Sequence, residues 1–473
     1  MRAVLTVLLF GLLAVPAGVG AQRPAERRCQ LEVVNVDREG VRQAFQGSEN
    51  YFAGGTLRLR CRNQPEVTLA GDSLESYTAQ IVRLLGSARY RDDDIDIQAD
   101  SIFYTKADER LQLRGNAVVT NRINGSTLAG PWIDYLRAVR GIRDSAETIA
   151  LQRPTVTYRV ARAEGDTVDP APYVITGDGM KTRGSSWMVA WGQVLVDRDS
   201  LHGRGDSLIY IQADEDDVTL VGGPATLARG GEDAFDVIGQ HVRLGLRGEE
   251  LRSVEAFGGG HVTTASADVV GDSVRLGFVD GQLEATRAWD RANGATVLAE
   301  GYDVRGDSIA IDTPGERLRE LRVFGRGTLL EPEDTAGTGA DSLAVPADSA
   351  ATDTLPPIRN TMTGARLTAR FTDADSAGVL LTRLVDIVAT GSATALFART
   401  VMREGKPSPT INYTRGDTII VTMKAGDSTG VHEVRAYRGS QPVDGIQLER
   451  ASLGRQARVG LPGTGSPRRE EGP

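Results

Sequence analysis

The 473-residue sequence has few aromatic residues, few histidines and cysteines, and no excess of positive charge. Aromatic residues make up 5% of the chain, so aliphatic side chains must form most of any core. The 54 Lys and Arg residues are outnumbered by 63 Asp and Glu residues, and no basic stripe stands out, which argues against a nucleic-acid partner. Four histidines without ligand spacing and two cysteines make a poor metal site, and we expect neither a metal nor a cofactor.

Long apolar runs are also scarce, and the main one lies at the N-terminus. Arg2 precedes an apolar run from Val4 to Val15, and small residues lead up to Ala21, a pattern typical of a secretory signal peptide. The run is too short for a membrane-spanning helix. No cysteine stands at the expected cleavage site for attachment of a lipid. We therefore expect residues 1–21 to be removed and the mature chain to be exported and soluble.

The two cysteines, Cys29 and Cys61, both lie in the exported part of the chain. An oxidising compartment favours a disulfide between them. Closing a loop of about 30 residues would stabilise the fold by roughly 3–4 kcal/mol in the chain-entropy model. Two free thiols are the alternative.

The abundant residue is glycine, with 55 copies, many of them next to runs of Val, Leu, Ile and Thr. One block recurs every 30–35 residues or so, with a small residue, then Asp, then Ser or Thr, then an apolar run. Its copies are Gly71-Asp72-Ser73, Ala99-Asp100-Ser101, Gly205-Asp206-Ser207, Gly271-Asp272-Ser273, Gly306-Asp307-Ser308 and Gly416-Asp417-Thr418. Because these residues favour turns, we predict a turn followed by a strand at each copy.

Apolar residues alternate along the run after each block, which is the period of a strand with one buried face. A second strand follows in each unit, with small residues at alternate positions, among them Ala117, Ala225, Gly260, Gly327 and Ala393. One such unit buries too little apolar surface to fold alone, so neighbouring units must stack. The sequence therefore predicts an all-β, elongated, repeat-built antiparallel structure of about ten strand-turn-strand units.

The residues of the recurring block also allow two functional interpretations, an adhesion motif and a catalytic serine. The repetition of the block argues against both. Arg-Gly-Asp occurs at 204, 305 and 415, always at the start of a repeat, so turn chemistry explains it without an adhesion receptor. Gly-Asp-Ser also resembles the nucleophile block of the GDSL esterases, and "DSLH" from Asp199 to His202 offers a base. A catalytic serine should occur once rather than in every repeat, and the helices of that family are missing. We therefore expect the protein not to be an enzyme.

Two further groups of residues leave alternatives open. The acidic run at Asp92, Asp93, Asp94 and Asp96 could bind Ca²⁺, but a solvated turn is the preferred interpretation. The four tryptophans could be platforms for sugars, but we favour a place in the core or lining a groove. They are Trp132, Trp187, Trp191 and Trp289.

The order of the segments follows from the repeats. We expect a main repeat domain over 28–330, interrupted by a polar loop at 161–172. Residues 331–360 lack a core pattern and are expected to be a disordered insertion. Repeats continue over 361–452, and residues 453–473 are expected to form a disordered tail.

One stretch, residues 97–136, resembles the organic-solvent-tolerance (OstA-like) family of periplasmic lipopolysaccharide-transport proteins. Ala99-Asp100, Phe103-Tyr104 and Leu111 to Val118 carry the family pattern, with Ala117 where the family has Val. Residues 209–227 repeat the pattern more loosely. The resemblance covers roughly 50–170 well, whereas minimal family members are far shorter than this chain.

The resemblance implies an elongated β-jellyroll, shaped like a folded sheet, whose apolar interior shields acyl chains in the periplasm. It implies a role in the transport of lipopolysaccharide or another outer-membrane glycolipid and in outer-membrane assembly. Partners would be that lipid, the inner- and outer-membrane transport components, and further copies of the chain joined head to tail. The residues expected in the lipid groove are Ile102, Tyr104, Leu208, Tyr210, Val242, Leu244, Val274, Leu276, Ile309 and Ile311. The alternative is a non-catalytic structural or adhesive envelope scaffold whose interior is packed.

Overall fold

The computed structural model describes residues 29–43, 49–77, 80–139, 141–159, 169–212, 216–231, 234–247, 250–330, 360–376, 379–403, 406–424, 431–443 and 445–449. These residues are almost all in β-strands, and one short 3₁₀ helix, η2 (Pro314–Glu316), lies among them. No helix in this described part is long and apolar enough to cross a membrane. The all-β prediction is confirmed. The expected signal peptide, most of the polar loop, residues 331–359 of the insertion and the tail lie outside the described residues.

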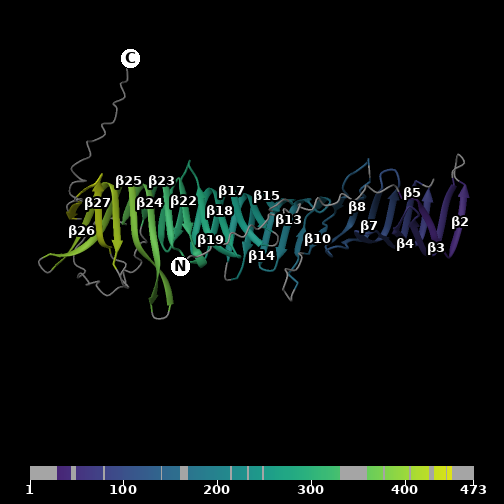
Figure 1. Cartoon of the computed structure of the whole chain (residues 1–473), viewed down its shortest axis with the longest axis horizontal. Coiled ribbons are helices and arrows are strands. Elements are labelled where there is room, and N and C mark those ends of the chain that lie inside the picture. Colours follow the sequence, from purple (N-terminus) through teal and green to yellow (C-terminus); the bar gives the residue numbers. More distant parts are fainter. Residues whose placement is uncertain are drawn as a thin grey trace, which may run out of the picture. The chain divides into compact units, whose positions relative to one another are not determined.

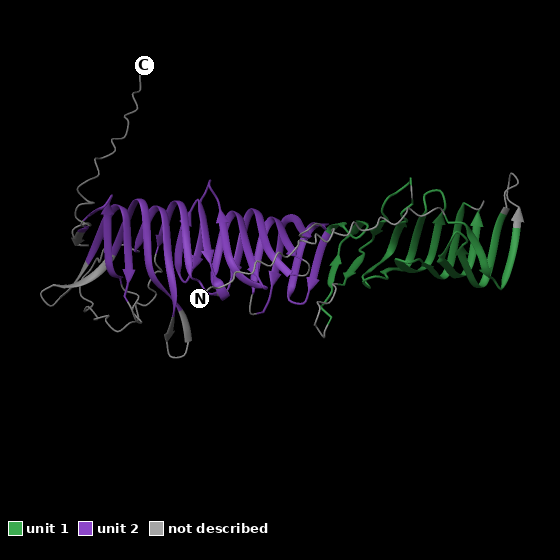
Figure 2. Cartoon of the chain, viewed as in Figure 1, with its two compact units in different colours: residues 1–192 green, residues 193–473 purple. Residues whose placement is uncertain are grey.

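The chain divides into two compact units, one ending at Gly192 and one beginning at Gln193 (Figure 2). The first unit contains β1 (Leu31–Asn35), β2 (Arg38–Gln43), β3 (Glu49–Cys61), β4 (Gln64–Tyr77), β5 (Ile81–Arg91), β6 (Ile95–Thr105), β7 (Arg110–Asn121), β8 (Thr127–Leu136), β9 (Glu147–Leu151), β10 (Thr155–Tyr158), β11 (Tyr173–Thr176), β12 (Gly179–Arg183) and the start of β13 (Trp187–Arg198).

The second unit contains the remaining strands. They are β14 (Leu201–Ile211), β15 (Asp216–Arg229), β16 (Phe235–Arg247), β17 (Glu250–Thr264), β18 (Ala267–Val279), β19 (Gln282–Trp289), β20 (Ala295–Ala299), β21 (Tyr302–Gly306), β22 (Ser308–Asp312), β23 (Glu320–Leu330), β24 (Thr361–Ser376), β25 (Val379–Arg403), β26 (Lys406–Met423), β27 (Val431–Arg438), β28 (Gln441–Pro442) and β29 (Ile446–Glu449).

Within each unit the strands lie side by side, and strands that follow one another in the chain mostly pair antiparallel (Figure 1). Hairpin connections are short, so nearly every pairing is local in sequence. The antiparallel, repeat-built sheet predicted from the sequence is therefore confirmed within each unit.

Most long strands change register near their middle, as β6 and β7 do between Gln98 and Ser101, and β16 and β17 do between Ile238 and His241. Elsewhere two short strands take the place of one bent strand. β21 and β22 pair with the two halves of β23, on either side of the bend. A register shift of this kind bends a strand. We call each bend a corner, and it divides the sheet of each unit into two walls.

Wall 1 contains the strand halves around residues 101–105 and 110–114 in the first unit, and 241–247 and 250–257 in the second. Wall 2 contains the halves around residues 95–98 and 118–121, and 235–238 and 261–264. On each wall buried and more exposed side chains alternate, as along β6 and β18. Each wall therefore has an inner and an outer face.

The Gly-Asp-Ser blocks lie at the corners and not in hairpin turns, so the predicted turn before each strand is wrong. Gly71, Gly205 and Gly271 are inside the continuous strands β4, β14 and β18. In β22 the strand begins directly after Asp307. The residues are structural, as expected, but they bend a strand midway instead of starting it.

Several corner aspartates pack against a glycine on the following strand. Gly115 and Gly325 have positive φ angles of 68° and 69°, and the next residue, Asn116 or Arg326, is also positive. A Cβ atom on Gly115 would overlap Asp100 Oδ2, and one on Gly325 would overlap Asp307 Oδ2. The same aspartates accept hydrogen bonds from Asn116 Nδ2 at 3.0 Å and from Arg326 Nε at 2.7 Å. The recurring Asp and Gly are thus two halves of one corner, contributed by neighbouring strands.

Replacing Gly325 by alanine is expected to lower the free energy of unfolding by about 1–3 kcal/mol, because of backbone strain and overlap with Asp307. Asp307→Ala should cost about 1 kcal/mol for its lost hydrogen bond. The double variant should be less destabilised than the sum, because removing the carboxylate removes the overlap. Urea denaturation measures each value.

Gly281→Ala is the matched control, since Gly281 has a φ of 82° and a Cβ there would meet nothing within 4 Å. The Gly281→Ala substitution should lower the free energy of unfolding through backbone strain alone. If the effects of Gly325→Ala and Asp307→Ala simply add, the proposed contact does not hold the corner.

Candidate functional site: the apolar interior

A continuous row of apolar side chains crosses the inner face of wall 1 in the second unit. Each member pairs directly with the next on the neighbouring strand, over twelve strands from β14 to β27. We call it inner row A, and its members are Leu208, Leu220, Val242, Ala256, Val274, Ala288, Ile309, Val323, Leu367, Ala389, Ile419 and Ala436. All are 5% exposed or less. With strands about 4.7–4.9 Å apart, the row is about 50 Å long.

A second row runs parallel to it, two residues along each strand. Inner row B consists of Tyr210, Val218, Leu244, Val254, Leu276, Thr286, Ile311, Leu321, Ala369, Ile387, Val421 and Val434. Its middle members are buried, whereas Tyr210, Val218 and Val434 at its ends are half-buried. Among the described residues of the second unit, the buried polar side chains are threonines, and none carries a charge.

The ten residues expected to line a lipid groove all lie on the inner face of wall 1. Eight belong to inner rows A and B, and Ile102 and Tyr104 hold the equivalent places on β6 of the first unit. All except Tyr210 are buried. Contact of these residues with lipid stays a prediction. Sequence inspection missed the members of the rows on the second strand of each repeat, which the same alternation could have identified.

The small residues of the second strand in each repeat lie beside the corners. Ala117, Ala225 and Ala393 are fully buried beside the corners. A Cβ on Gly260 would lie 3.2 Å from both Ala256 Cβ and Val274 Cγ2. Small side chains are needed here because the corner brings the two halves of a strand close together.

Aromatic pairs join the two walls of the second unit at the edge opposite the corners. Phe235 on wall 2 meets Phe278 on wall 1 with ring centroids 5.7 Å apart. Tyr302 on wall 2 meets Phe371 on wall 1 at 6.3 Å. Aromatic pairs contribute about 0.5–1.5 kcal/mol each beyond their buried area. The described contacts at the edge of this unit are thus aromatic pairs together with a hydrogen bond from Arg229 Nη1 to the carbonyl oxygen of Gly281, at 3.3 Å.

The first unit is closed differently, by a buried polar cluster that we call the clasp. Arg137 Nη1 donates to Glu109 Oε2 at 3.1 Å, and Arg137 Nη2 donates to Gln64 Oε1 at 2.9 Å. Glu109 also accepts from the Tyr104 hydroxyl at 2.8 Å and from the Cys29 amide at 3.2 Å. Glu109 and Arg137 adjoin wall 1, whereas Gln64 and Cys29 adjoin wall 2. The clasp therefore joins the two walls.

The clasp lies beside the disulfide and a buried tyrosine. Cys29 and Cys61 are bonded, as expected, and both are buried.

Burial raises the pKa of Tyr90 well above its usual value, so its hydroxyl remains a donor to Asp92 at 2.8 Å. Asp92 also accepts from the amides of Asp94 and Ile95, which confirms a turn at this acidic run.

The other residues that the sequence suggested for a catalytic or metal-binding site do not come together in the described part of the chain. His202 of the "DSLH" segment bonds Asp197 at 2.8 Å on an exposed surface. Across the described ranges, no group of three or more His, Cys, Asp or Glu side chains is placed to hold a metal ion. Trp132, Trp191 and Trp289 are each about 40% exposed, so none of these three lies in the core. Trp289 lines a shallow hollow, which agrees with the other expected position, the lining of a groove.

Comparison with known proteins adds little to this picture. No family model and no curated protein matches the sequence. A solved structure that matches is LptH, the LptA homologous periplasmic component of the conserved lipopolysaccharide transport device from Pseudomonas aeruginosa. The match has 16% identity and a TM-score of 0.22, and it covers 26% of this chain and 85% of that one. At this level it carries no argument about function.

Proposed function

We propose that the protein is an exported, non-enzymatic carrier that binds the acyl chains of an outer-membrane glycolipid between its walls. Lipopolysaccharide is the proposed lipid, and transport and outer-membrane assembly are the proposed process. The observation that carries the proposal is inner row A of the second unit, an uninterrupted apolar row of about 50 Å, with inner row B beside it, which is apolar except at Thr286. The sequence resemblance at residues 97–136 and the buried disulfide, which suits an oxidising compartment, support it.

The second unit is the proposed place of loading, because its walls can separate more easily. Loading requires the walls to part, since the inner rows are buried. Opening the aromatic edge gives up about 0.5–1.5 kcal/mol per pair, beyond the burial of the rings themselves. Acyl chains would then replace the lost contacts between walls. Breaking one partner of a buried ion pair such as Arg137–Glu109 costs about 3–5 kcal/mol, so the first unit should stay closed.

A packed scaffold is the second candidate, and one observation favours it. Every member of inner row A is 5% exposed or less, so the side chains already fill the interior without a ligand. In that case the partners would be envelope proteins or polymers bound on the outer faces.

Photo-crosslinking separates the two candidates. A benzophenone side chain at Tyr210, which is half-buried in inner row B, replaces one aromatic group by another. A carrier should form lipid adducts at this position when the full chain is mixed with vesicles of lipopolysaccharide and phosphatidylethanolamine, and mass spectrometry identifies the lipid. Ile211, the exposed neighbour, is the matched control. No adduct at 210 above the level at 211 would favour the scaffold.

A further inference from the structure

A row of aromatic and serine side chains crosses the outer face of wall 1 in the second unit, directly beside the corners. Pairing partners on consecutive strands alternate as Phe257, Ser273, Trp289, Ser308 and Phe324. We call this set the outer aromatic row. Each ring is two strands from the next, so the rings recur about every 9.4–9.8 Å.

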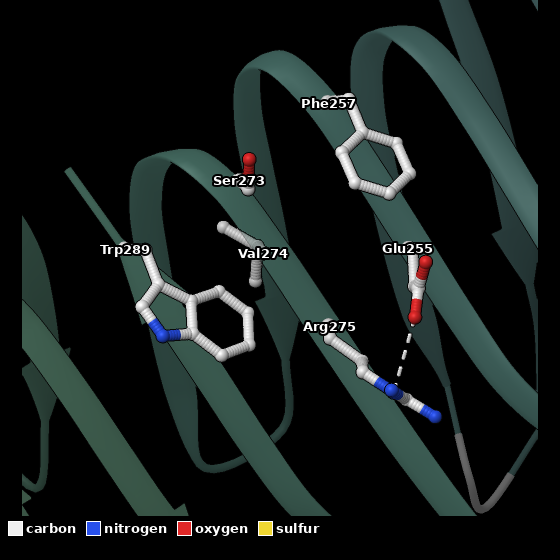
Figure 3. A pocket seen from close by; sticks show the side chains of 6 residues that line it. All are labelled: Glu255, Phe257, Ser273, Val274, Arg275 and Trp289. Carbon is white, nitrogen blue, oxygen red and sulfur yellow. Dashed lines mark ion pairs between the residues drawn. The ribbon is translucent and has the colours of Figure 1, made fainter.

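The rings stand clear of their neighbours because serine occupies the strand between them. Trp289 and Phe324 are 40% and 41% exposed. Figure 3 shows the rings of Phe257 and Trp289 with their faces toward the viewer, on either side of Ser273. Exposed ring faces of this kind are stacking surfaces and not core.

The space between the first two rings is a shallow hollow of about 310 Å³. It is lined by the two rings together with Ser273, Val274 and the ion pair of Arg275 Nε with Glu255 Oε1, at 3.2 Å (Figure 3). The volume is at the lower end of the range of about 300–1,000 Å³ typical of ligand sites. Because its lining combines two aromatic rings with the polar groups of Ser273, Arg275 and Glu255, the hollow suits the ring of one sugar, which has both an apolar face and hydroxyl groups.

Charges of both signs surround the rings. Arg287 pairs in register with Arg275, is exposed, and makes no ion pair within the part of the chain that the structure describes. Asp290 follows Trp289, and hydrogen bonds led by the backbone amide of Asn293 lower its pKa, so it stays ionised. Donors and acceptors are therefore available together beside Phe257 and Trp289, where these charges balance, which suits the hydroxyl groups of a neutral sugar. Arg366, which is exposed and pairs in register with Phe324, adds a further donor.

We propose that the outer aromatic row binds an extended, neutral, β-linked polysaccharide chain that runs across the strands. Two strand spacings are close to the advance of two sugar rings in such a chain, so every second sugar can stack on Phe257, Trp289 and Phe324 in turn. The apolar face of a pyranose ring suits the electron-rich face of an aromatic ring. The intervening sugars lie over the serines, with Arg275 and Glu255 within reach of their hydroxyls.

The proposal does not depend on the carrier function, because the row is on the outer face and the inner rows are on the opposite face of the same wall. A failure to bind lipid would leave the glycan site untouched. A failure to bind glycan would leave the lipid-carrier proposal untouched.

Isothermal titration calorimetry of the full chain with cellohexaose, chitohexaose and maltohexaose tests the proposal. At least one β-linked hexasaccharide should bind, whereas the curved α-linked maltohexaose should not. Trp289→Ala should raise the Kd by at least about tenfold, the size of effect expected for a central aromatic contact. Because Trp289 is exposed, the variant should fold normally, which circular dichroism verifies.

Trp132→Ala is the matched control. Trp132 is similarly exposed, and its pairing partners on the two neighbouring strands are Arg114 and Leu151. Two strands away, there is no aromatic ring on the Arg114 side, and the residue on the Leu151 side is Gly179. Its substitution should leave the Kd unchanged. Absence of binding by both β-linked sugars, equal binding of maltohexaose, or an unchanged Kd in Trp289→Ala would each overturn the proposal.

Discussion

Replacing Arg137 by methionine is expected to lower the free energy of unfolding of the first unit by about 3–5 kcal/mol. The side chains of Arg137 and Glu109 are 2% and 0% exposed, and their charges are 3.1 Å apart. Methionine keeps much of the volume but leaves the Glu109 carboxylate buried without its cation. The hydrogen bond to Gln64, which joins the walls, is lost as well. Urea denaturation of the full chain, followed by a probe in the first unit, measures the change.

Two further variants show whether the charge or the volume is responsible. Glu109→Leu combined with Arg137→Met removes both charges and should recover part of the lost stability, because no unpaired charge remains. Arg183→Met breaks an exposed pair with Glu147 in the same unit, and it should cost less than about 1 kcal/mol. Equal effects of Arg137→Met and Arg183→Met would show that the clasp does not hold the walls together.

Leu208→Asp is expected to prevent the second unit from folding, or to destabilise it by more than about 4 kcal/mol. Leu208 begins inner row A and is 1% exposed. Aspartate there places a carboxylate among aliphatic side chains where the described residues offer no buried cation, and burying such a charge costs several kcal/mol. Circular dichroism and urea denaturation of the full chain measure the effect.

Ile211→Asp on the same strand is the control for this substitution. Ile211 is 47% exposed, so the same chemical change should alter stability by less than about 0.5 kcal/mol. Leu208→Ala should lower stability by about 2–5 kcal/mol without adding a charge. If Leu208→Asp were tolerated as well as Ile211→Asp, the inner face of wall 1 would have been assigned to the wrong side.

The strands and their buried faces could be read from the sequence because they depend on local alternation. Ile309 and Ile311 are two residues apart and both buried, as the period of a strand requires. The role of Asp307 could not be read in the same way. A turn and a corner use the same residue types, and only contact with Gly325 on the next strand distinguishes them.

The clasp and the outer aromatic row could not be predicted from the sequence either. Gln64, Glu109 and Arg137 are far apart in the chain, and no local pattern joins them. Trp289 was expected either in the core or lining a groove, and the sequence could not decide between the two. At a corner the extra residue shifts the alternation, so the face of a residue beside it cannot be counted from the strand alone.

The adduct formed at position 210 is the most direct test of whether the interior of the second unit accepts hydrocarbon. A covalent product carrying a lipid's mass is expected at 210, with little or none at 211, the outward-facing neighbour on the same strand. Equal labelling at both positions, or a protein that stays unmodified at 210 in the presence of lipopolysaccharide vesicles, would contradict it.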